Sequence, residues 1–124
     1  MGREARREDI AREVVEGTVR SLPPDLSRFA EQVAVSYEPA VARHWIEDGV
    51  EPDSLGLFSG PSYADEDYGT DFEPPLITLF LANLWDFAEG DMAAFRREVR
   101  TTYLHEFGHF LGLDEDGLAE RGLE

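Results

Sequence analysis

The sequence "YLHEFGHFLGLDEDGL", residues 103–118, contains two of the three histidines of the chain, four residues apart, with a glutamate directly after the first. Residues four apart lie on one face of an α-helix, so both imidazoles can reach the same ion. Glu106 lies about 100° further round the helix, where it can act on a water molecule at that ion. We therefore predict a metal centre with His105 and His109 as ligands and Glu106 as the catalytic general base.

The helix that carries this motif has recognisable ends and two different faces. Asp91 is suited to cap its start, and Gly112 stands where a left-handed residue often ends a helix. Apolar side chains recur on one stripe, which we expect to face the core: Met92, Phe95, Val99, Tyr103, Phe107 and Phe110. The two histidines fall on another line, together with Glu98 and Thr102. These two residues could support a metal ligand, although for Glu98 we favour a plain solvent-facing role.

The motif extends beyond the second histidine. Gly112 lies three residues after His109, and Glu115 three residues after that, which completes the pattern H-E-x-x-H-x-x-G-x-x-E. This pattern resembles that of the metzincin-type zincins, in which the chain turns at the glycine and brings a third histidine to the metal. The resemblance implies Glu115 as the third metal ligand, since carboxylate oxygens are ordinary zinc ligands. Asp114 and Asp116 flank Glu115 and remain alternatives.

A closer resemblance is to a family of small bacterial zincin-like metallopeptidases, in which an acidic residue occupies the third ligand position. It covers most of the chain, through the leading helix, "LPPDLSRF", "LGLFSG", "LITLF" and "FRREVRTTYLHEFGHFLGLDEDGL". Because Met1 and Met92 are the only methionines, no Met-turn can follow the motif as it does in metzincins. The resemblance implies a zincin-like fold with Zn2+ as cofactor.

Composition narrows the class of protein further. A chain of 124 residues without cysteine predicts one domain, residues 1–124, with no disulfide or thiolate metal site. The net charge of −16 opposes binding to nucleic acid. No apolar run approaches the roughly 20 residues that cross a bilayer, and no signal peptide is recognisable, so we expect a cytoplasmic protein without membrane contact.

Periodicity and turn residues predict an α+β fold, a small mixed β-sheet packed against an N-terminal helix and the long histidine-bearing helix. Helices are expected at residues 5–20, at 40–49 and in the segment after Asp91, with a single helical turn at 25–29. Strands are expected at residues 31–38, 55–60 and 76–81. The strand "LITLFL", 76–81, could be an edge that pairs with an extended substrate or an interior strand. Residues 61–75 are predicted to form a long acidic loop.

Several residues have alternative interpretations. Tyr63 and Tyr68 could stabilise an oxyanion, although packing is the commoner role of loop aromatics. His44 has no partner at ligand spacing, and we assign it to packing or the surface. The acidic loop lacks the ligand spacing of a calcium site.

We predict a zinc-dependent metallopeptidase that hydrolyses peptide bonds of an unidentified peptide or protein substrate, with Glu106 as general base. The alternative is a catalytically silent metal-binding protein with a structural, regulatory or partner-binding role. A weaker third hypothesis is an interaction domain without metal.

Overall fold

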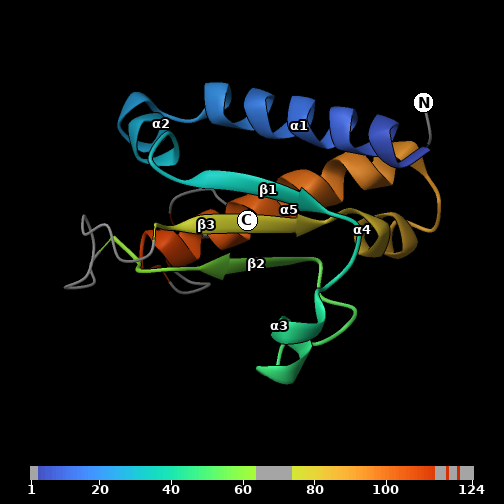
Figure 1. The fold of residues 1–124 in the computed structure, drawn as a ribbon. Helices are drawn as coiled ribbons and strands as arrows, with labels where there is room; N and C mark the ends of the chain where they lie inside the picture. Colours follow the sequence, from blue (N-terminus) through green and yellow to red (C-terminus); the bar gives the residue numbers. More distant parts are fainter. Residues whose placement is uncertain (1–2, 64–73, 114–116, 118–119, 121–124) are drawn as a thin grey trace.

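The structure is a computed structural model that describes residues 3–63, 74–113, 117 and 120. Its helices and strands follow in the order α1 (Arg3–Ser21), α2 (Pro24–Ala30), β1 (Ala34–Glu38), α3 (Arg43–Glu47), β2 (Gly56–Ser59), β3 (Leu76–Phe80), α4 (Leu81–Phe87) and α5 (Met92–Phe110) (Figure 1). The predicted elements are confirmed with bounds that shift by a few residues. Within the described residues, no helix has the length and apolar character needed to cross a membrane.

The three strands form one mixed sheet, and its order corrects one of our interpretations. In the order β1-β3-β2, β1 runs parallel to β3 and β2 antiparallel to it. The interpretation of "LITLFL" as an edge strand is therefore wrong, because β3 is central. Its continuous apolar sequence fits a strand covered on both faces, and Ile77, Leu79 and Phe80 are at most 1% exposed. In the described part of the chain, β1 and β2 form the sheet edges.

The core lies between the sheet and the two long helices. In Figure 1, α5 passes behind the sheet, where it contacts β2 and β3, and α1 packs against α5 on the β1 side. The predicted apolar stripe of α5 is buried except at its first residue: Phe95, Val99, Tyr103, Phe107 and Phe110 are at most 1% exposed, whereas Met92 is only partly buried. Burying one such side chain contributes about 1.5–3 kcal/mol, so this face of α5 makes a large contribution to the stability of the fold.

Local interactions define both ends of α5. At its start, the Asp91 carboxylate accepts a backbone N–H of the first helical turn at 2.8 Å, as predicted. At its end, Gly112 has φ +77°, a left-handed conformation that glycine adopts without strain. The N–H groups of Gly112 and Leu113 donate to the carbonyls of His109 and Gly108, at 3.0 and 2.9 Å. This Schellman arrangement reverses the chain directly after the two histidines.

Side-chain and backbone hydrogen bonds locate the start of β2. The Asn83 amide on α4 donates to the carbonyls of Pro52 and Ser54, at 2.9 and 2.8 Å. The backbone N–H of Phe80 then donates to the Leu55 carbonyl at 3.0 Å. The loop before β2 is thereby tied to α4, and β2 enters the sheet from a defined point.

Candidate metal centre

His105 and His109 lie one turn apart near the C-terminal end of α5, on the face predicted from their spacing. Their Nε2 atoms are 3.2 Å apart. The rings meet edge to face at 88°, with centroids 4.7 Å apart. Both Nε2 atoms therefore converge on one point beside the helix.

This separation of the two nitrogen atoms fits a shared metal ion. Two nitrogen ligands of a tetrahedral zinc ion, each about 2.0–2.1 Å from the metal, lie about 3.3 Å from one another. The observed 3.2 Å matches that value without any change of side-chain position. The His109 side chain is 50% exposed, so the point where the nitrogen atoms converge is open to solvent on one side.

Glu106 lies beside the two imidazoles and completes the group. Its Oε1 is 3.9 Å from the His109 Nε2, and its side chain is only 12% exposed. Within the described part of the chain, His105, Glu106 and His109 form the group that could hold a metal ion, with ligand atoms within 4.8 Å of one another. Burial raises the pKa of Glu106, although His109, His105 and a hydrogen bond from the Phe58 backbone oppose the shift.

The strand β2 supplies that hydrogen bond, which sequence reasoning did not predict. The backbone N–H of Phe58 donates to the Glu106 carboxylate. One signal was available in the sequence: Gly56 is an isolated glycine inside the predicted strand, and such a glycine often marks a close approach of two backbones. The site is therefore built from β2 as well as from α5.

The predicted third ligand lies outside the described residues, as do its alternatives Asp114 and Asp116. Leu113, just past the turn at Gly112, is the last described residue before them. Glu115 as a metal ligand stays a prediction. The turn itself is the one expected from the extended motif.

Tyr63 and His44 both make aromatic contacts, and the oxyanion role of Tyr63 stays an untested alternative. The Tyr63 ring packs edge to face on Phe29, with centroids 4.7 Å apart, and its backbone N–H donates to the Phe110 carbonyl. His44 packs against the neighbouring Trp45 on α3, with ring centroids 4.8 Å apart. Tyr68 and the acidic segment 65–73 lie outside the described residues.

The other residues of the histidine face differ from each other. Thr102 is buried at 7% exposure and faces β2 at Gly56, whereas Glu98 is partly exposed. Tyr103 and Phe107 belong to the core, as predicted. Burial raises the pKa of Tyr103 from 10.0 to about 12, in keeping with its place in the core.

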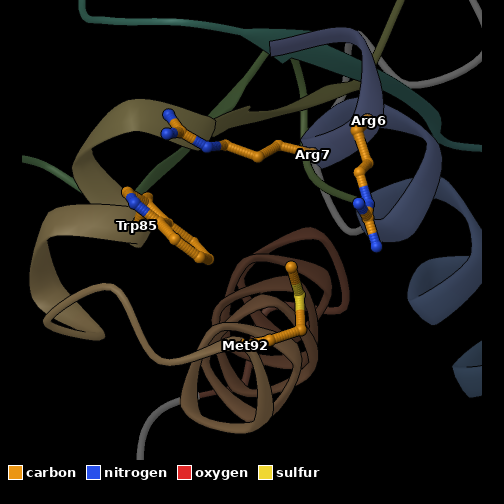
Figure 2. A pocket seen from close by; sticks show the side chains of 4 residues that line it. All are labelled: Arg6, Arg7, Trp85 and Met92. Atoms are coloured by element: carbon orange, nitrogen blue, oxygen red, sulfur yellow. The ribbon is translucent and has the colours of Figure 1, made fainter. Parts of the chain in front are cut away.

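A separate hollow of about 300 Å3 lies toward the other end of α5 and is lined by Arg6, Arg7, Trp85 and Met92 (Figure 2). The Arg7 guanidinium lies 4.8 Å from the centre of the Trp85 ring. Met92 begins α5, and at 1.5 Å per residue it lies about 20 Å along the helix from His105. The hollow joins α1, α4 and α5 and does not contribute to the metal centre.

Comparison with known proteins adds family membership to this geometry. A family model described as zincin-like metallopeptidase matches residues 30–123. The match contains the whole sheet and α5, while the leading helix and "LPPDLSRF" (residues 22–29) precede it. No match was found among curated proteins. Since the family model matches most of the chain and includes the His105-Glu106-His109 cluster, the chain belongs to the zincin-like metallopeptidase family.

Proposed function

We propose that the protein is a zinc-dependent peptidase in which His105, His109 and Glu115 hold the zinc ion and Glu106 is the general base. The convergence of the two Nε2 atoms at 3.2 Å, with the partly buried Glu106 carboxylate beside them, is the observation that carries this proposal. Family membership supports peptide hydrolysis. The choice of Glu115 follows the spacing of the extended motif.

The chemistry divides between the metal and the protein. A bound zinc ion would lower the pKa of a water molecule to about 7 and polarise the carbonyl of the scissile bond. Glu106 accepts the proton of the attacking water and passes it to the leaving amine. A carboxyl group whose pKa is raised by burial holds that proton more readily than an exposed one, which suits this transfer.

The edge strand β2 is the element that we expect to receive the substrate. We assigned that role to "LITLFL" as one alternative, but β3 is interior and has no free edge in the described sheet. An extended peptide can add to a sheet edge through backbone hydrogen bonds. Because β2 lies beside Glu106, a peptide paired with it would pass close to the general base.

Metal content and cleavage test the proposal. The purified protein is loaded with zinc, and cleavage of a broad peptide library is followed by mass spectrometry. We expect Glu106→Gln to retain zinc and to lose about 10²- to 10⁴-fold in cleavage rate, the usual contribution of general acid-base catalysis. Glu98→Gln, on the same helix but partly exposed, is the matched control and should cleave as the native protein does.

Two outcomes contradict the proposal in different ways. Retained zinc with the same background cleavage in native protein and Glu106→Gln would favour a catalytically silent metal-binding protein. Zinc content below about one tenth of an equivalent would exclude both metal hypotheses, because functional sites of this type bind zinc tightly. Glu115→Gln, compared with Asp114→Asn and Asp116→Asn, identifies the third ligand by the loss of zinc affinity.

A further inference from the structure

The backbone of β2 passes unusually close to α5 at Gly56. A Cβ atom added there would lie 2.6 Å from the Thr102 Cγ2, 3.3 Å from the Thr78 carbonyl oxygen and 3.4 Å from the Glu106 Cγ. The first distance is shorter than any ordinary carbon–carbon contact, which lies near 3.5–4.0 Å. A residue other than glycine at position 56 would therefore require a shift of the Thr102 side chain, of β2 or of α5.

The surroundings of Gly56 offer little room for such a movement. Thr102 is 7% exposed, and a β-branched side chain on a helix has few allowed positions. The Thr78 carbonyl belongs to the central strand β3, which pairs with β2. A larger residue at position 56 would therefore push β2 away from α5.

The alternation of the antiparallel ladder explains what this close approach achieves. The Phe80 N–H donates to the Leu55 carbonyl, which makes these residues a hydrogen-bonded pair. In an antiparallel ladder such pairs alternate with non-hydrogen-bonded pairs. Leu57 therefore bonds to β3, while the backbone groups of Gly56 and Phe58 point away from it. The Phe58 N–H, which is not bonded to β3, donates to the Glu106 carboxylate.

We infer that Gly56 is a positioning residue: its missing side chain lets β2 approach α5 closely enough for the Phe58 N–H to hold the Glu106 carboxylate beside the two imidazoles. The inference rests on the proposed role of Glu106 as general base. It goes beyond that role because it assigns the placement of the base to the edge strand.

Hydrogen exchange of single backbone amides tests the inference without any substrate. In Gly56→Ala, we expect the Phe58 amide to exchange about tenfold faster or more, the effect of losing a hydrogen bond to a charged group. Glu106→Ala should produce the same change, while the Leu57 amide stays protected in both variants. Gly17→Ala is the matched control, since a Cβ there meets only the end of a flexible arginine, at 3.8 Å.

A second substitution separates positioning from general damage to the fold. Thr102→Ser removes the Cγ2 that the new methyl group would meet, so Gly56→Ala/Thr102→Ser should restore protection of the Phe58 amide. In the cleavage assay, Gly56→Ala should lower kcat by about 10- to 100-fold with zinc affinity unchanged, as expected for a small misplacement of a catalytic group. The double variant should recover most of that loss.

The inference is overturned if Glu106→Ala leaves exchange of the Phe58 amide unchanged. It is also overturned if Gly56→Ala keeps native protection, or if the double variant folds but leaves that amide unprotected. The double variant keeps the test decisive should Gly56→Ala fail to fold. The Phe58 amide could be protected in the native protein and unprotected in Glu106→Ala while the native protein cleaves no peptide. That result would contradict the proposed function but support the inference that β2 positions Glu106.

Discussion

The two faces of α5 differ in what holds their side chains. On the core face, Phe95 and Phe107 are fully buried; Phe95 packs against Trp85 of α4, and Phe107 packs against Tyr103 and Phe110. On the other face, His109 is half exposed, and Glu106 is held by one backbone group of β2. The comparison shows that one helix can stabilise the fold through many apolar contacts and place reactive groups through a few polar ones. The two faces should therefore respond differently to substitution.

The largest effect is expected on the core face. Phe107→Ala removes a side chain with no exposed surface, and such a change costs about 3–5 kcal/mol. Urea unfolding followed by circular dichroism measures the loss. Phe87→Ala, at a residue that is 61% exposed, is the control and should stay within about 0.5 kcal/mol of the native protein. Equal losses in the two variants would show that the core assignment of α5 is wrong.

On the opposite face, the expected effect is on metal binding rather than on folding. Substituting a residue that merely supports a metal ligand lowers metal affinity by roughly 10- to 100-fold. His109→Ala removes a ligand itself, so it should lower zinc affinity by more than that. Without metal, its free energy of unfolding should stay within about 0.5 kcal/mol of the native value, because the side chain is half exposed. Calorimetric zinc titration checks the first point and urea unfolding the second. The exposed His44→Ala is the control, and unchanged zinc affinity in His109→Ala would remove this residue from the site.

The smallest effect concerns Glu106, whose side chain is only 12% exposed. Its pKa is raised by burial, so the folded protein binds this proton more tightly than the unfolded chain does. At pH 7 the ionised carboxylate therefore costs stability, and the metal-free Glu106→Gln protein should melt at a higher temperature than the native protein. The cost disappears as the pH falls through the raised folded pKa toward the ordinary value of 4.5. Thermal unfolding at pH 7 and near pH 4 tests this sign.

Glu98→Gln is again the control, because that carboxyl group is only partly buried. Lower stability of Glu106→Gln at pH 7 would mean that the Phe58 hydrogen bond outweighs the cost of burial. A gain at pH 7 that shrinks at low pH would identify Glu106 as a group placed for catalysis at the expense of stability.

Much of the fold and half of the site could be predicted from local sequence patterns. The spacing of His105 and His109 determines that they share one helix face, because both residues belong to the same helix. The apolar stripe, the Asp91 cap and the turn at Gly112 are equally local, and the structure confirms each of them. These features depend on residues a few positions apart, so the amino-acid sequence is sufficient to predict them.

The parts that were missed depend on residues far apart in the chain. The apolar run of β3 is compatible with an edge or an interior strand until its two neighbours are known. The donor at Phe58 and the acceptor at Glu106 are separated by more than a third of the chain. Their contact depends on the register between β2 and β3. A shift of one residue would turn the Phe58 N–H toward β3 and away from Glu106.

The sequence by itself therefore determined the helix, its two faces and the pair of imidazoles that can share a metal ion. Only the tertiary structure decided which strand lies beside them and which backbone group holds the general base. The physical reason is that side-chain direction along a helix follows from its period, whereas the pairing of strands follows from packing of the whole chain. Gly56 illustrates both kinds of information. The sequence shows that it has no side chain, but only the structure shows that Thr102 and Glu106 lie where that side chain would be.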